Sequence, residues 1–384
     1  MPAIYIHWPF CISKCPYCDF NSHVGDTSDQ EVWRNAYRRE MQHYAGLHPD
    51  SSISSIYFGG GTPSLMEART VDSVLQDISR LWRIEKDAEI TIEANPSSAE
   101  TSKFADFRKS GVNRLSLGVQ SLNDAALQFL GRAHNAREAK NAIALAEKHF
   151  LRFSFDMIYG YAGQTPDKWR QELREAISLA NGHLSLYQLT IEPHSQFYSR
   201  THHGEMLTAS DEDAVTMYET TQNMTSAAGL PAYEISNHAH PGQESRHNLT
   251  YWHYEDYIGI GPGAHGRFVH NNARHATENI RAPDTWLNEV EKRGVGIKTD
   301  EKLDAATSMR EAFMMGLRLT EGIDLDRWQK KFPTPLPAFL SAGHLARLEK
   351  EGLILQNEKV LRATPAGLQR LNAVLSYLLN SHWQ

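Results

Sequence analysis

The chain has few cysteines, no long apolar run and no extended run of basic residues. All three cysteines of its 384 residues lie between positions 11 and 18. An odd number of clustered thiols argues against a disulfide framework and favours a metal or redox site. Because no apolar run approaches the ~18–20 residues of a transmembrane helix, we expect no membrane-spanning segment. The first ten residues do not form a secretory leader, so the expected compartment is the cytoplasm.

The charge balance also excludes a class of partners. The formal net charge is −7, and acidic and basic residues are mixed along the chain. This balance disfavours nucleic-acid binding. With 41% hydrophobic and 22% charged residues, the composition is that of a folded globular protein.

Short β-rich runs alternate with amphipathic stretches over the first two thirds of the chain. The six runs are Ile4–His7, Ser54–Phe58, Glu89–Glu93, Arg114–Val119, Phe153–Ile158 and Leu184–Ile191. The stretches with helical spacing are 29–47, 71–82, 103–109, 124–130, 136–148 and 167–179. Repeated β-α units imply a parallel sheet, and six of them suit an α/β fold with a partial (β/α)6 TIM-like barrel.

Unusual residues follow these strands, where a parallel barrel places its functional side chains. The cysteines follow the first strand and GGGTP, residues 59–63, follows the second. Glu93 ends the third strand, Gln120 follows the fourth, and Asp156 lies near the end of the fifth. We therefore expect these residues to meet at one rim of the barrel.

Three regions are expected along the chain: a core barrel (1–240), a connecting region (241–300) that contains HNLTYW, and a mostly helical domain (301–384). Residues 349–371 have the helix, strand, turn, strand, helix order of a winged helix. A DNA-binding role is disfavoured, since residues 301–384 hold 11 Lys and Arg against 9 Asp and Glu.

The thiols of Cys11, Cys15 and Cys18 have a C-x3-C-x2-C spacing. One interpretation is a structural zinc site with His7 or His23 as fourth ligand. A tight wrap of three thiolates suits a single iron–sulfur cluster better. Such clusters normally take four cysteines, so one iron would be open to a small molecule.

The triplet, with Tyr17 between its last two thiols, resembles the radical S-adenosylmethionine (SAM) superfamily. The resemblance implies a [4Fe–4S] cluster whose open iron binds SAM and passes one electron to it. GGGTP strengthens it, because glycines allow positive φ angles and a close backbone approach to a ligand. In that superfamily the equivalent stretch holds the methionyl amine, which implies SAM contacts for Gly60, Gly61 and Thr62.

Further motifs indicate which group within the superfamily the chain resembles. YIHWPFCISKCPYC, YFGGGTPSL, EANP, GVQS, Gly131–Arg132 and FDMIYG are similar to the group that contains oxygen-independent coproporphyrinogen III oxidase and the haem chaperone HemW. This resemblance runs from residue 5 to about 266 and implies cofactor contacts for Tyr5 (through its backbone), Tyr17, Glu93, Gln120, Arg132 and Asp156. Alternatively, Gln120 and Asp156 cap the helices that follow them. The chain departs from its relatives at Tyr161 and Ala162, where they tend to have Leu-Pro.

Two features favour the HemW family over the oxidase. The oxidase has a fourth cysteine two positions after the third, where this chain has Phe20. HNLTYW, residues 247–252, matches the HNxxYW motif that is associated with haem binding. The resemblance implies that His247 contacts haem, with Tyr251 and Trp252 offering flat apolar faces. The alternative is a hydrogen-bonded structural histidine, and His265 is the second candidate for the haem contact.

The expected function is that of a haem chaperone that binds haem and transfers it to apo-haem proteins such as respiratory cytochromes. Its expected cofactors are a [4Fe–4S] cluster, SAM and haem. The alternatives are the oxidase, which decarboxylates coproporphyrinogen III, and a zinc-stabilised interaction protein. Enzyme activity, a homodimer and peripheral association with the inner face of the membrane are left open by the sequence.

Overall fold

A parallel sheet forms the centre of the computed structural model, which describes residues 2–25 and 29–379. The six predicted strands are confirmed and lie side by side in chain order. They are β1 (Ala3–Trp8), β4 (Ser52–Gly60), β5 (Arg83–Ala94), β6 (Arg114–Gln120), β7 (Arg152–Tyr159) and β8 (His183–Gln188). The last strand ends three residues before the predicted Ile191, and β5 begins six residues before the predicted Glu89.

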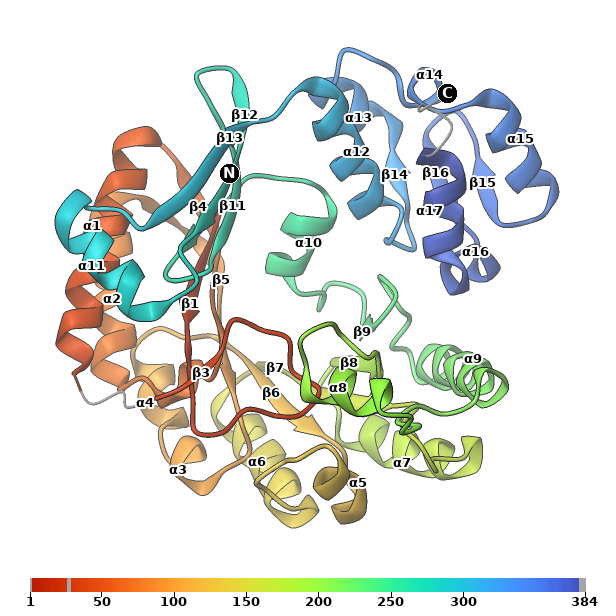
Figure 1. Ribbon diagram of the computed structural model, residues 1–384, viewed down its shortest axis with the longest axis horizontal. Helices are drawn as coiled ribbons and strands as arrows, with labels where there is room; N and C mark the ends of the chain where they lie inside the picture. The colour runs from red at the N-terminus through yellow and green to blue at the C-terminus, as the bar shows by residue number, and fades with distance from the viewer. Residues whose placement is uncertain (1, 26–28, 380–384) are drawn as a thin grey trace.

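Helices pack around the outside of this curved sheet (Figure 1). They are α1 (Gln30–Leu47), α2 (Ala68–Leu81), α3 (Ser98–Thr101), α4 (Phe104–Lys109), α5 (Asp124–Phe129), α6 (Ala136–His149) and α7 (Pro166–Leu179). Their starts follow ordinary capping rules: Asn135 and Glu138 form a capping box on α6, and Thr165 caps α7 with Pro166 in its first turn. The (β/α)6 partial barrel is thus confirmed.

The sheet extends beyond the predicted barrel at both edges. On one side β10 (Tyr257–Ile260) runs parallel to β1, and three antiparallel strands follow it: β11 (His265–His270), β12 (Ala273–Asn279) and β13 (Ile297–Lys302). On the other side β9 (Asn237–Ala239) pairs antiparallel with β8. Much of the expected connecting region, 241–300, is therefore continuous with the main sheet.

A buried carboxyl group fastens this extension to α1. Glu40 is fully buried, and its two oxygens accept four hydrogen bonds. The donors are the backbone amides of Gly261 (2.7 Å) and Gly296 (2.9 Å), Nε1 of Trp286 (3.1 Å) and Nδ2 of Asn279 (3.2 Å). Trp286, on α11 (Pro283–Arg293), also stacks on Trp33 of α1. Residues from 261 to 296 are thereby held on a helix that ends at residue 47.

The C-terminal region has its own hydrophobic core. Its helices are α12 (Ala305–Gly316), α13 (Leu325–Lys331), α14 (Leu336–Phe339), α15 (Ala342–Lys350), α16 (Pro365–Gln369) and α17 (Leu371–Leu379). A small sheet is formed by β14 (Ile323–Asp324), β15 (Ile354–Gln356) and β16 (Val360–Ala363). The order α15, β15, β16, α16 is the predicted winged-helix order.

Helix α10 (Arg246–Trp252) lies between the main sheet and the C-terminal helices (Figure 1). Nζ of Lys331 on α13 donates to the carbonyl oxygens of His253 (2.7 Å) and Tyr254 (2.9 Å), just after the last turn of α10. A cation at this position satisfies carbonyl groups that the helix itself leaves unpaired. The segment between β8 and β9 holds α8 (Gln196–His202) and α9 (Asp211–Ala227). Within the described residues, no helix is both long and apolar enough to span a bilayer.

Replacing Glu40 with leucine should destabilise the fold severely. The change removes the acceptor of four buried donors, and each buried donor left unsatisfied costs about 1–3 kcal/mol. We expect a loss of at least about 3 kcal/mol in the free energy of unfolding, measured by urea titration. Glu40→Gln keeps one oxygen and should cost clearly less; equal losses for the two variants would contradict this role.

Candidate functional site

Two loops pair with each other beyond the ends of β1 and β4. The loop with the cysteines begins at β2 (Phe10–Cys11) and returns at β3 (His23–Val24), which pairs with β2. The amide of Gly61 donates to the carbonyl of Trp8 (2.7 Å), and the amide of Thr62 donates to that of Phe10 (2.8 Å). The glycine loop is therefore hydrogen-bonded along its length to the start of the cysteine loop.

Glycine is required at positions 60 and 61 by this pairing. Gly60 has φ +115°, and a Cβ there would lie 2.8 Å from the carbonyl oxygen of Trp8. A Cβ on Gly61 would lie 2.7 Å from the carbonyl oxygen of Phe10. The sequence predicts close approach to a ligand, and the structure adds a second reason, namely contact between the two loops.

The three thiols open into one cavity of about 460 Å³ at the rim of the barrel. Cys11, Cys15 and Cys18 are each partly exposed. Thr62 Oγ1 donates to Cys11 Sγ (3.3 Å), and Arg132 donates to Cys15 Sγ (3.3 Å). Burial raises the pKa of the Cys11 and Cys18 thiols above the usual value. Donors aimed at sulfur would stabilise thiolate once a metal centre has displaced the protons.

The residues present fit a [4Fe–4S] cluster. Within residues 2–25 and 29–379, no three His, Cys, Asp or Glu side chains gather closely enough to hold a single metal ion. The thiolates of a four-iron cluster need no such convergence, because each binds a different iron. The three thiols face a shared cavity with a glycine cradle on one side, which is the arrangement that a three-cysteine cluster with one open iron needs.

All of the other predicted SAM-contacting residues except Tyr5 line this same cavity. They are Tyr17, Gly60, Gly61, Thr62, Glu93, Gln120, Arg132 and Asp156. The phenol of Tyr5 instead makes a 3.0 Å hydrogen bond with His7 Nδ1, which agrees with a predicted contact through its backbone alone. The rule that functional residues follow barrel strands thus brings the expected set together.

Arg132 lines the cavity next to the cysteine loop. Its guanidinium donates to the carbonyl of Gly118 (2.9 Å), to Oδ1 of Asn95 and to the hydroxyl of Tyr17 (3.4 Å). Because one of its nitrogens also contacts Cys15 Sγ, the side chain joins the cysteine loop to the ends of β5 and β6.

Two carboxyl groups face the cavity from neighbouring parts of the sheet. Burial raises the pKa of Glu93 to about 7, and the nearby Asp156 carboxylate adds to this effect. Burial likewise raises the pKa of Asp156 to about 6. Oε1 of Glu93 accepts from the Tyr57 hydroxyl (2.9 Å), and Oε2 accepts from the amide of Gly60 (3.3 Å).

Neither Gln120 nor Asp156 caps the helix that follows it. Asn123 caps α5 and Thr165 caps α7. Gln120 has φ +69°, a backbone conformation that residues other than glycine rarely adopt. The structure thus removes the capping alternative, and a strained backbone turns Gln120 into the cavity lining.

The HNLTYW motif faces the barrel. His247 is 1% exposed, and both of its ring nitrogens are engaged: Nδ1 with Ser55 Oγ (3.0 Å) and Nε2 with the Tyr251 hydroxyl (2.7 Å). Burial lowers the pKa of His247 to about 3, so its ring is neutral. The next residue, Asn248, lines the cavity that the cysteines open into. The second candidate, His265, is exposed at the start of β11.

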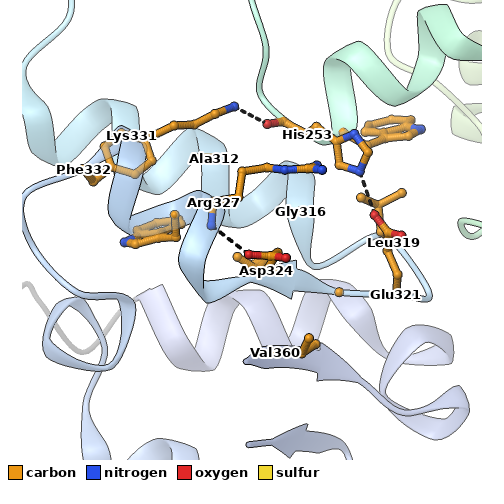
Figure 2. Close-up of a pocket in the computed structure, with 14 residues that line it drawn as sticks. His253, Ala312, Gly316, Leu319, Glu321, Asp324, Arg327, Lys331, Phe332 and Val360 are labelled. Carbon is orange, nitrogen blue, oxygen red and sulfur yellow. Dashed lines mark hydrogen bonds and ion pairs between the residues drawn. The ribbon is translucent and has the colours of Figure 1, made fainter. Parts of the chain in front are cut away.

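A smaller cleft of about 160 Å³ lies at the other end of α10 (Figure 2). Its walls include Trp252, Trp328 and Phe332. In Figure 2, His253 points toward Glu321, and its Nε2 lies 2.7 Å from a Glu321 carboxylate oxygen. The charged residues on its rim, Arg327 and Lys331 against Glu321 and Asp324, are balanced in sign.

Sequence reasoning missed several residues of the main cavity. Tyr57 and Asn95 lie beside predicted residues, in YFGGGTP and EANP, and could have been found there. Arg114, His183 and Asn237 line the end of the cavity away from the cysteines. Each of them is the first residue of a strand. The rule that functional residues follow the ends of barrel strands gives no information there.

Comparison with known proteins agrees with this geometry. A family model described as the radical SAM superfamily matches residues 5–176, and one for the HemN C-terminal domain matches residues 303–370. The chain is 37% identical to the haem chaperone HemW of Escherichia coli, with 83% of each chain covered. It is 32% identical to the HemW of Bacillus subtilis, with 99% of each covered.

The chain is also similar to a mitochondrial protein and to a solved structure. The bovine mitochondrial radical S-adenosyl methionine domain-containing protein 1 is 37% identical over 98% of this chain and 87% of its own. The solved structure of coproporphyrinogen III oxidase (HemN) from Escherichia coli has a TM-score of 0.82 at 21% identity, covering 99% of this chain and 90% of that one. This last likeness establishes the fold. The HemW relatives, which are more than 30% identical and match over most of their length, show that the chain belongs to the HemW family of the radical SAM superfamily.

Proposed function

We propose that this protein is a haem chaperone that carries a [4Fe–4S] cluster and SAM and delivers haem to apo-haem proteins such as respiratory cytochromes. The observation that carries the cofactor part is the shared cavity of about 460 Å³, which three half-open thiols and eight further predicted contacts line together. The haem part is supported by the full-length relatives that are named haem chaperones. The proposed compartment is the cytoplasm.

In this proposal Cys11, Cys15 and Cys18 hold the cluster, and the glycine loop with Glu93, Gln120, Arg132 and Asp156 holds SAM. The cluster, when bound, supplies one-electron reduction of the SAM sulfonium. Glu93 and Asp156 would accept hydrogen bonds from an ammonium or from ribose hydroxyls. Arg132 would reach a carboxylate through its Nε, since both of its terminal nitrogens already donate to protein acceptors. The protein's own contribution is to fix these groups at the wall of one cavity.

The second candidate function is oxygen-independent oxidation of coproporphyrinogen III, because the fold is shared with that oxidase. Position 20 argues against it: Phe20 lines the mouth of the cavity with 60% of its surface exposed, where the oxidase has a further cysteine. An apolar ring cannot supply that thiol.

Binding of haem iron by His247 would cost buried hydrogen bonds. Ligation of iron through either ring nitrogen would break a buried hydrogen bond, to Ser55 or to Tyr251. His265 is exposed, and His253 lines the smaller cleft at the end of the same motif. These three histidines are the ones to compare in haem titrations.

Replacement of any one of the three cysteines with alanine should abolish the broad charge-transfer absorption of the anaerobically reconstituted cluster, because each binds its own iron. Iron and sulfide analysis should show the same loss. The cavity-lining Ser13→Ala is the matched control and should leave the spectrum unchanged. An unchanged spectrum in any of the three cysteine variants would defeat the assignment of that cysteine as a cluster ligand.

SAM affinity should rise as the pH is raised from 5.5 to 7.5. Burial keeps most of Glu93 protonated below about pH 7 and most of Asp156 protonated below about pH 6, and an ionised carboxylate is the stronger hydrogen-bond acceptor. Calorimetry on the reconstituted protein should show at least a threefold gain over this range. Glu93→Gln should bind SAM more weakly and flatten the profile; an unchanged profile would remove Glu93 from the SAM site.

Porphyrin fluorescence and haem titration separate the two candidate functions. Reconstituted protein given dithionite, SAM and coproporphyrinogen III should form no protoporphyrinogen catalytically, while haem should bind near stoichiometrically. Catalytic product formation would establish the oxidase. Soret titrations of His247→Ala, His253→Ala and His265→Ala then identify the haem contact, since the ligand's variant alone should lose the wild-type band.

A further inference from the structure

A continuous row of contacts leads from the HNLTYW motif to the glycine loop. The ring of His247 stacks on Tyr57, with centroids 4.9 Å apart and planes inclined by 22°. The hydroxyl of Tyr57 donates to Glu93 Oε1 at 2.9 Å. Glu93 Oε2 in turn accepts from the amide of Gly60 at 3.3 Å. Three contacts thus connect the motif's histidine with the backbone of the predicted SAM-binding loop.

A second row runs from the same histidine to the cysteine loop. The ring of Tyr5 lies 6.3 Å from that of His247 and 6.3 Å from that of Tyr57. Its hydroxyl contacts His7 Nδ1 at 3.0 Å, and His7 Nε2 contacts the carbonyl oxygen of Asn21 at 2.9 Å. His247 therefore touches the rings that support both loops of the site.

The ring of His247 is held from its edges while its face supports Tyr57. Ser55 and Tyr251 engage its two nitrogens, and the amide of residue 247 donates to Glu89 Oε1 at 3.2 Å. Each of these partners is on β4, β5 or α10 itself. The ring is neutral and enclosed, and both of its nitrogens are hydrogen-bonded. It can therefore hold the Tyr57 ring in place by packing, and it adds no charge to the site.

We propose that His247 is a positioning residue for SAM, which acts through Tyr57 to hold Glu93 against Gly60. The inference rests on the proposed function in taking SAM as the ligand of this cavity, and it is independent of whether haem binds. Without the imidazole face, the Tyr57 ring gains freedom and its hydroxyl no longer fixes the rotamer of Glu93. The motif that distinguishes this family from the oxidase then also serves the SAM site, through Tyr57.

The test measures SAM affinity by calorimetry in reconstituted, haem-free protein of verified iron content. Tyr57→Phe keeps the ring and removes only the hydroxyl; we expect about five- to tenfold weaker binding, the effect of one lost buried hydrogen bond. His247→Gln removes the stacked face and should weaken binding about threefold or more, while His247→Phe keeps a flat ring and should recover most of the wild-type affinity.

Two readouts separate positioning from general destabilisation. The double variant His247→Gln with Tyr57→Phe should bind little more weakly than Tyr57→Phe alone, because both changes act on Glu93 through one route. Tyr57→Phe should also move the pH midpoint of SAM binding upward, since the Tyr57 hydrogen bond lowers the pKa of Glu93. Leu361→Ala, a buried truncation in the C-terminal core, is the stability control and should leave SAM affinity unchanged.

The outcomes distinguish this inference from the proposed function. If wild-type protein with a full cluster fails to bind SAM, the proposed function itself is wrong. If wild type binds SAM and the Tyr57 and His247 variants bind it equally well, the positioning role is overturned. Strictly additive losses in the double variant would also overturn it, because they would show two independent effects.

Discussion

The backbone pairing of the glycine loop with the start of the cysteine loop is the constraint on which the site depends. Two amide donors, from Gly61 and Thr62, and the absence of two β-carbons allow the loops to run side by side. The ligands of the expected cluster and the cradle of the expected SAM are thereby fixed relative to each other before any cofactor arrives. Preorganisation of this kind lowers the ordering cost of binding.

Two buried glutamates, Glu40 and Glu93, have different roles: Glu40 stabilises the fold, and Glu93 faces the proposed SAM site. Glu40 has four donors on its two oxygens and lies deep between α1 and the extension of the sheet. Glu93 has a donor on each oxygen and remains open to the cavity. Burial raises the pKa of both to about 7, so the shift alone does not separate them. The two glutamates differ in access to a cavity large enough for a ligand, which Glu93 has and Glu40 lacks.

Much of the fold and the rim of the site could be predicted because strands and helices have distinct local patterns. The six strands read as β-rich runs separated by amphipathic stretches, and strand ends in a parallel barrel share one rim. The role of Glu40 could not be predicted, since a glutamate in an amphipathic helix is expected at the surface. The surroundings of His247 were equally hidden: Ser55 and Tyr57 precede it by about 190 residues, and pairing over such separations leaves no local pattern.

The position of β1 at the middle of the sheet has a consequence for biosynthesis. Ala3 pairs with Ser55 on one side and with Tyr257 on the other. At about 5–20 residues per second, the ribosome needs on the order of tens of seconds to produce that second neighbour. One edge of the first strand therefore waits uncovered while the β-α units behind it emerge. All residues that line the cavity, up to Asn248, are therefore made before the strand that covers this edge, Tyr257–Ile260.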